Sequence, residues 1–198
     1  MSTLFDEHHR ALQRRFDTER LADRIEQRLC HDRLSDDDRA FIARLDMFFL
    51  ATVNAAGQPS CSYKGGDAGF VRCVDAGTIV FPNYDGNGMY LSMGNVAATA
   101  QVGMLFIDFA RPQRLRVHGA ARIVPADSLV PSYAGAQFLV SVAVQQVFPN
   151  CPRYIHTMQE TAHSEFVPRT DTAAPIPKWK RMEWAVDVLP ADDPARKP

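Results

Sequence analysis

The sequence lacks the features that mark several specialised classes of protein. Its four cysteines, Cys30, Cys61, Cys73 and Cys151, lie far apart and form no C-x-x-C pair, which argues against a disulfide framework and a zinc knuckle. No apolar run approaches the length of a membrane span, and the first ten residues, MSTLFDEHHR, lack the basic and apolar segments of a secretion signal. We therefore expect reduced thiols in a cytoplasmic protein with no membrane partner.

The sequence also lacks an excess of either positive or negative charge. The chain has 22 basic and 23 acidic residues and a formal net charge of -1 at pH 7, so it has no global field to attract nucleic acid. We expect no nucleic-acid partner, and any anion site must be local. The sequence contains no nucleophile elbow and no HExxH motif, so a hydrolase has no support.

Glycine and proline are missing from the first 56 of the 198 residues. The segment from Leu4 to Cys30 has apolar residues mostly four apart, which predicts one amphipathic helix, and Ser35 with Asp38 predicts the capped start of a second, short helix. We therefore expect residues 1–45 to form a helical extension that packs on a domain formed by residues 46–198.

From Phe48 onward, short strands alternate with loops rich in glycine and asparagine. Such a pattern predicts a small barrel whose glycine-lined rims let backbone N–H groups approach a phosphorylated planar cofactor. The predicted strands are Phe48–Val53, Pro59–Lys64, Phe70–Val74, Thr78–Pro82, Val102–Asp108, Arg114–Val124 and a run from Phe138 through Val147, with a helical segment at Met89–Thr99 and a further possible strand at Trp184–Leu189.

Two loops are candidates for phosphate binding. Gly65 and Gly66 follow a strand but open into another strand, which excludes a Rossmann fingerprint or a P-loop. The run from Asp85 to Gly88 leads into the helical segment, and a helix N-terminus presents free N–H donors and a positive dipole end to an anion. A plain turn explains the same residues equally well.

Basic side chains on strands are further candidates. Arg114 and Arg116 share one face of their strand, and with Lys64 they could neutralise a phosphate or stabilise an electron-rich ring if they border a cleft. If that face is open to water, they have no special role.

After the last long strand, polar and aromatic residues cluster between Asn150 and His156. They either line a pocket, with Arg153, Tyr154 and His156 as candidate substrate contacts, or cap the barrel. The spacing of Cys151, His156 and His163 matches no standard metal site, so we expect no metal.

The chain from Asp46 to His156 resembles the pyridoxamine 5'-phosphate oxidase superfamily of split-barrel flavoproteins, especially its predicted flavin-nucleotide-binding branch. The resemblance rests on FFLATVNAAGQP, SYKGGDAGFV, FPNYDGNGMYLSMGN, VGMLFID, RLRVHG and NCPRYIH in that order. It implies a mainly β, α+β fold: a six-stranded antiparallel split barrel that dimerises, with FMN at the subunit interface.

The resemblance also implies a set of cofactor-binding positions. It places Ser60, Cys61, Ser62 and Lys64 along the isoalloxazine ring, Phe81, Pro82 and Asn83 at ring and phosphate contacts, and Arg114, with Arg116 beside it, where a polar residue of the partner subunit reaches the flavin.

The sequence departs from the vitamin B6 oxidase itself at several of its binding positions. Asn87 and Gly88 stand where that enzyme has an Arg-Lys phosphate grip, and Pro59 replaces a strand-opening arginine. Its C-terminal Trp and Arg signature is only loosely echoed around Trp179 to Trp184. The resemblance thus favours FMN, but not oxidation of pyridoxamine phosphate.

Three hypotheses follow. The first is a homodimeric FMN-dependent oxidoreductase that transfers hydride or electrons between a small-molecule substrate or NAD(P)H and an acceptor, with the phosphate held by Lys64, Asn87, serine hydroxyls and helix-end N–H groups. The second is a non-catalytic flavin or haem (tetrapyrrole) carrier or sensor, in which His156 or His118 would be the axial ligand to haem. The third is a structural dimer without cofactor.

Overall fold

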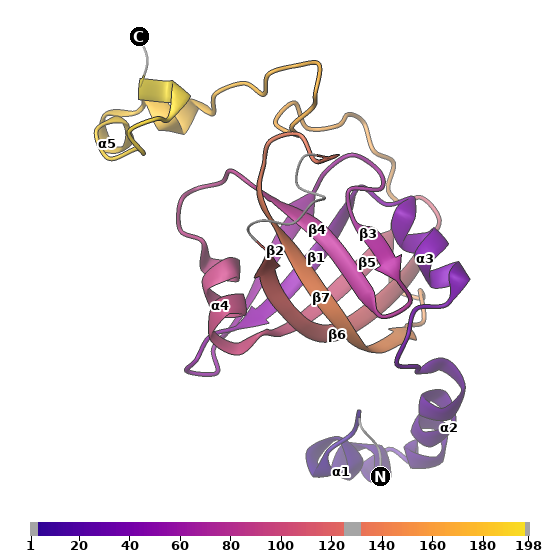
Figure 1. Ribbon diagram of the computed structural model, residues 1–198. Coiled ribbons are helices and arrows are strands. Elements are labelled where there is room, and N and C mark those ends of the chain that lie inside the picture. Colours follow the sequence, from indigo (N-terminus) through magenta and orange to yellow (C-terminus); the bar gives the residue numbers. More distant parts are fainter. Residues whose placement is uncertain (1–3, 125–131, 197–198) are drawn as a thin grey trace. The chain divides into compact units, whose positions relative to one another are not determined.

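The computed structural model describes residues 4–124 and 132–196 (Figure 1). The chain divides into two compact units, Met1–Glu160 and Thr161–Pro198. No helix in the described ranges is both long enough and apolar enough to cross a lipid bilayer.

The first unit is built on one curved antiparallel sheet (Figure 1). The strands are β1 (Met47–Val53), β2 (Pro59–Gly65), β3 (Arg72–Asp75), β4 (Thr78–Tyr84), β5 (Gln101–Asp108), β6 (Gln113–Val124) and β7 (Ala136–Pro149), in the order β2-β1-β5-β6-β7-β4-β3. This confirms the mainly β split-barrel fold. The described residues form seven strands instead of the six that the resemblance implies, and the short β3 pairs with β4 at the edge of the sheet.

The concave side of the sheet holds an aromatic core. The ring of Phe48 is fully buried and lies 5.9, 5.1 and 5.3 Å from the rings of Phe70, Phe81 and Phe106. These rings come from the loop before β3 and from β4 and β5, so one cluster joins elements that are far apart in the sequence.

Helix α4 (Leu91–Thr99) is fixed to the sheet by buried polar contacts. The Nδ2 of Asn95 donates to the Oγ1 of Thr52 at 3.0 Å, and the hydroxyl of Thr99 donates to the carbonyl of Val53 at 2.8 Å. Breaking a buried hydrogen bond of this kind leaves an unsatisfied group. The contacts therefore fix the position of the helix on β1.

The prediction of a single helix from Leu4 to Cys30 is wrong. The structure has α1 (Glu7–Arg15) and α2 (Glu19–Leu29), because Asp17 between them takes the left-handed φ of 51°. A short polar side chain tolerates that conformation. The N–H of Thr18 then donates to the carbonyl of Gln13 at 2.8 Å, which ends α1.

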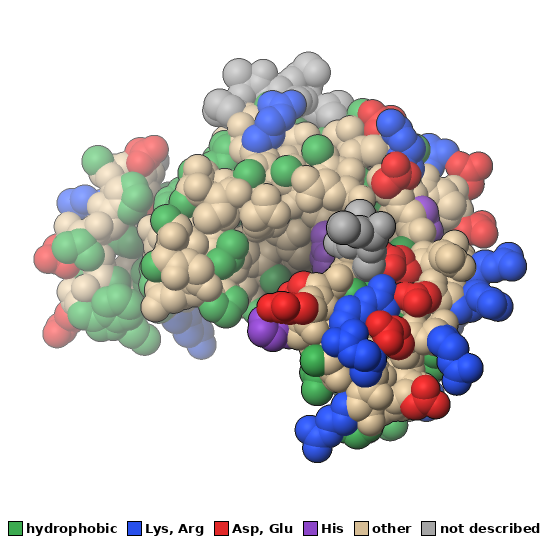
Figure 2. Space-filling model, turned by 90° about the horizontal axis from the view of Figure 1, so that it is seen from below, with side chains coloured by type: hydrophobic (Ala, Val, Ile, Leu, Met, Phe, Trp, Pro, Cys, Tyr) green, Lys and Arg blue, Asp and Glu red, His purple; other side chains and the backbone are tan. Residues whose placement is uncertain are grey.

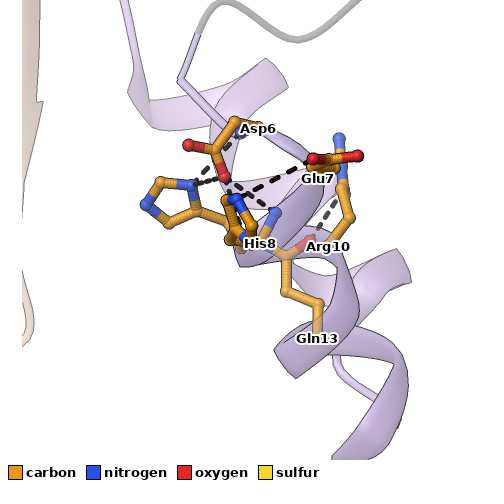
Figure 3. A network of polar contacts seen from close by, with 6 residues as sticks. Asp6, Glu7, His8, Arg10 and Gln13 are labelled. Atoms are coloured by element: carbon orange, nitrogen blue, oxygen red, sulfur yellow. Dashed lines mark hydrogen bonds and ion pairs between the residues drawn. The ribbon is translucent and has the colours of Figure 1, made fainter.

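Polar contacts shape these two helices. The carboxylate of Asp6 caps α1 by accepting from the N–H groups of His8 and His9, and Arg10 donates to Gln13 at 2.9 Å (Figure 3). Arg10 also pairs with Asp23 of α2 at 2.7 Å. No described residue of α1 or α2 is buried. In the view from below, positive and negative side chains lie interspersed on the surface (Figure 2).

Helix α3 (Asp36–Ala43) behaves as predicted. The Oγ of Ser35 accepts from the N–H of Asp38 at 3.1 Å, which confirms the capping signal. Phe41 and Ile42 are buried in the core of the barrel. Within the N-terminal extension it is therefore α3, and not α1 or α2, that contributes buried residues to the core.

In its described residues, the second unit contains three short helical segments, η2 (Lys178–Arg181), α5 (Glu183–Val186) and η3 (Pro194–Arg196). The prediction of a possible strand at Trp184–Leu189 is wrong, because the backbone N–H groups of this segment donate to carbonyls nearby in the sequence and not to another strand. Inside the unit, the Nζ of Lys180 lies 2.8 Å from a carboxylate oxygen of Asp193 in a buried ion pair.

Gly119 is expected to be a sensitive position, because it lies at the irregularity where β6 meets β7. A Cβ there would lie 2.4 Å from the carbonyl oxygen of Ala143 and 2.8 Å from the side chain of Val142. Gly119→Ala should therefore lower the free energy of unfolding by about 1–3 kcal/mol, measured by urea denaturation. In the control Gly103→Ala, the new Cβ meets its neighbours at 3.7 Å, so equal losses in the two variants would contradict the packing argument.

Candidate functional site

A cleft of about 250 Å³ opens between β2 and the segment that joins β4 to α4. In Figure 1 this segment swings out beside the sheet before the helix begins. The lining residues come from β2 (Ser60, Cys61, Ser62, Lys64), from the end of β4 (Asn83, Tyr84) and from the loop and first turn of α4 (Gly86, Asn87, Gly88, Met89, Tyr90, Leu91, Ser92, Met93).

Most of the predicted cofactor-binding positions meet in this cleft. Those that do are Ser60, Cys61, Ser62, Lys64, Asn83, Asn87 and Gly88. They come from segments separated by about twenty residues of chain, so their convergence is a property of the fold. Their contact with a ligand stays a prediction.

Four of the predicted cofactor-binding positions lie outside the cleft. Phe81 and Pro82 are buried in β4, and the ring of Phe81 belongs to the aromatic core. Arg114 donates to the carbonyl of Cys151 at 2.6 Å, and Arg116 lies 6.0 Å from the ring of Phe148. Both arginines are on β6, which β5 and β1 separate from β2 in the sheet, so they do not line the cleft of their own chain.

The candidate substrate contacts Arg153, Tyr154 and His156 are exposed in the segment that follows β7. The guanidinium of Arg153 lies 5.8 Å from the ring of Tyr154. The backbone N–H and side chain of Arg153 lower the pKa of the neighbouring Cys151 thiol. The structure does not bring these residues into the cleft.

Among the described residues, Lys64 is the only cationic side chain that lines the cleft. It is half-buried, and burial lowers its pKa. No hydrogen-bond acceptor or anion among the described residues is paired with its ammonium group. Partial burial costs the ammonium some of its hydration, and an anion that reaches it offsets that cost.

The N-terminus of α4 also faces the cleft. Its N-cap, Tyr90, provides no side-chain cap, and the N–H groups of Leu91, Ser92 and Met93 have no acceptor in the described part of the chain. The side chain of Ser92 is only 8% exposed and its hydroxyl likewise has no partner there. Unpaired donors and the positive end of a helix dipole together make an anion-binding site.

Sequence analysis identified the loop before α4 but missed Ser92, because a serine within a helical segment is unremarkable until its depth in the fold is known. It also missed the apolar rim formed by the exposed side chains of Met89, Tyr90 and Leu91. The cleft thus combines a polar, cationic interior with an apolar edge, which suits a ligand that has an anionic end and a planar apolar part.

Residues 34–153 match the family model described as pyridoxamine 5'-phosphate oxidase. This match spans more than half of the chain and confirms the resemblance. The chain belongs to the pyridoxamine 5'-phosphate oxidase family. A comparison with curated proteins finds no match.

Solved structures similar to this family member include a putative pyridoxamine 5'-phosphate oxidase from Lactobacillus delbrueckii, with 19% identity, a TM-score of 0.49 and coverage of 60% of this chain and 95% of that one. An FMN-binding protein from Syntrophomonas wolfei has 12% identity, a TM-score of 0.44 and coverage of 71% and 97%. HutZ, a haem storage protein from Vibrio cholerae, has 20% identity, a TM-score of 0.39 and coverage of 59% and 94%.

Proposed function

We propose that this protein binds FMN with the phosphate in the cleft and acts as a cytoplasmic oxidoreductase. One observation carries the proposal: an unpaired ammonium (Lys64), an uncapped helix N-terminus and the unpaired hydroxyl of a largely buried serine (Ser92) converge in one cleft. Family membership supports a flavin, and the donor set fits a phosphate monoester, which offers several acceptor oxygens to such donors.

Each group in the cleft has a distinct role in this proposal. Lys64 neutralises part of the phosphate charge, while Ser92 and the N–H groups of the first turn donate hydrogen bonds. The hydroxyls of Ser60 and Ser62 on β2 add donors along the opposite wall. When bound, FMN supplies hydride or electron transfer between a small-molecule substrate or NAD(P)H and an acceptor.

A second copy of the chain would complete the site. At about 250 Å³ the cleft is smaller than the roughly 300–1,000 Å³ of pockets that enclose drug-sized ligands, so it holds the phosphate end and leaves the ring at the rim. We propose a homodimer in which the flavin lies at the subunit interface and Arg114 of the partner subunit approaches the ring.

The purified protein is expected to be yellow or to become so when FMN is added. Absorption near the flavin bands should fall on anaerobic addition of NADH or NADPH if the protein is an oxidoreductase, and light scattering should give the mass of a dimer. A protein that neither carries nor binds FMN would overturn the proposal. Flavin that is bound but not reduced by either nucleotide would exclude NAD(P)H as the donor and leave a small-molecule reductant or a non-catalytic carrier.

A second candidate function is haem binding, supported by His118. Its Nδ1 lies 3.3 Å from the Oε1 of Gln146, the arrangement in which a metal-ligating histidine is oriented by an acceptor on its other nitrogen. It borders a groove of about 770 Å³ with Val53, Val102 and Gly103. A Soret band that disappears in His118→Ala would favour haem over FMN.

A further inference from the structure

The N-terminus of α4 is held by a network that includes a residue outside the lining of the cleft. Tyr90, the N-cap, has the left-handed φ of 47°, which is uncommon for a residue with a large side chain. A strained backbone conformation persists only where the surroundings hold it in place. Something must therefore fix Tyr90.

The side chain that holds Tyr90 belongs to Gln137 on β7. Its Oε1 accepts a hydrogen bond from the hydroxyl of Tyr90 at 3.1 Å and another from the Nδ2 of Asn83 at 3.0 Å. The ring of Tyr90 also stacks on Phe138, with centroids 6.5 Å apart. The Oε1 of Gln137 is thus a shared acceptor that links the start of α4 to the end of β4.

Gln137 reaches this position because of a β-bulge. In the pairing of β4 with β7, Asn83 lies opposite Phe138 and Tyr84 lies opposite Ala136, so Gln137 is the extra, unpaired residue. Bulges redirect a side chain and are over-represented beside functional sites. The bulge directs the Gln137 amide toward the residues at the cleft rim.

We propose that Gln137 is a positioning residue: through Tyr90 it aims the free N–H groups of α4 at the phosphate in the cleft. This inference rests on the proposed FMN function. It predicts that Gln137 affects recognition of the phosphate and leaves recognition of the flavin ring unchanged. Riboflavin, which has the ring and the ribityl chain but no phosphate, is the matched ligand.

The test measures affinity for FMN and for riboflavin in wild type, Gln137→Leu, Tyr90→Phe and the double variant. Each single change should weaken FMN binding roughly threefold to tenfold, the effect of one hydrogen bond. Gln137→Leu, at a residue that does not line the cleft, should leave riboflavin affinity unchanged. The double variant should be no worse than Gln137→Leu, which already removes the hydrogen bonds from both Tyr90 and Asn83. Tyr63→Phe on β2 is the control, since its exposed hydroxyl has no hydrogen-bond partner in the described residues.

Hydrogen exchange of the unliganded proteins gives an independent readout. The amide of Gly94, whose N–H donates to the carbonyl of Tyr90 at 2.7 Å, should exchange faster in Gln137→Leu than in wild type. An unchanged ratio of FMN to riboflavin affinity in the variants would overturn the inference while the FMN function stands. A wild-type protein that does not bind FMN would overturn the proposed function and the phosphate role of Gln137 with it.

Discussion

Replacing Lys64 with methionine is expected to weaken FMN binding about tenfold to a hundredfold. A hydrogen bond to a charged group contributes about 1.5–3 kcal/mol, and each 1.4 kcal/mol is a factor of ten. Lys64 is half-buried and unpaired among the described residues, so solvent screens it less than a surface lysine. Titration of flavin fluorescence would measure the change.

Lys178→Met provides the control, because it removes an exposed lysine of the second unit. Its FMN affinity should equal that of wild type. Equal affinity in wild type and Lys64→Met would mean that the phosphate lies elsewhere. A parallel loss of riboflavin affinity in Lys64→Met would place the ring, and not the phosphate, beside Lys64.

The same residue gives the binding a pH dependence. Burial lowers the pKa of Lys64, and only the protonated amine attracts an anion, so FMN affinity should fall as pH rises through this lowered pKa. Between that value and the ordinary pKa of lysine, the unfolded chain binds more protons than the folded one. The stability of the unliganded protein should therefore rise with pH in that window, and both trends should be absent in Lys64→Met.

The fold was largely predictable because its signals are local. Alternating apolar residues and turn residues such as Gly57 and Gly77 give the strands and hairpins directly. The break at Asp17 leaves only a small trace in the sequence, because the step from Phe16 to Leu21 is five residues whereas the other steps between Leu12 and Leu29 are four. The apolar positions of α1 and α2 continue the same pattern on either side of it.

The site was predictable only in part, for a related reason. Lys64, Asn87 and Gly88 lie on motifs that a reader can find in the sequence. Ser92 and Gln137 depend on burial and on a bulge between strands that are about fifty residues apart, so their environment exists only in the folded chain.

The structure also gives a physical reason why this chain lacks the Arg-Lys pair. Gly88 has a φ of 76°, a conformation that glycine adopts without strain and a lysine would not. The side chain of Asn87 accepts from the N–H of Met89 at 3.1 Å and so shapes the turn. In the proposed site, the loop presents backbone donors and Lys64 on β2 would supply the charge from the opposite wall.

Replacing Phe48 with alanine is expected to produce the largest loss of stability. The ring is 0% exposed and contacts three other phenylalanines, and truncating a buried phenylalanine costs about 3–5 kcal/mol. For a protein of this size the melting temperature should fall by roughly 6–20 °C. The control Phe16→Ala removes a ring that is 67% exposed and should change stability by about 0.5 kcal/mol or less.

Phe48→Ala also distinguishes an effect on the stability of the fold from an effect on FMN binding in the cleft. Phe48 does not line the cleft, so the folded variant should keep its FMN affinity, and FMN at a hundred times its dissociation constant should restore about 2.7 kcal/mol. Calorimetry with and without FMN measures this recovery. If Phe48→Ala and Phe16→Ala lose the same stability, the aromatic cluster is not the core of the barrel. If stability falls but FMN gives no recovery, the cleft depends on Phe48 for its shape.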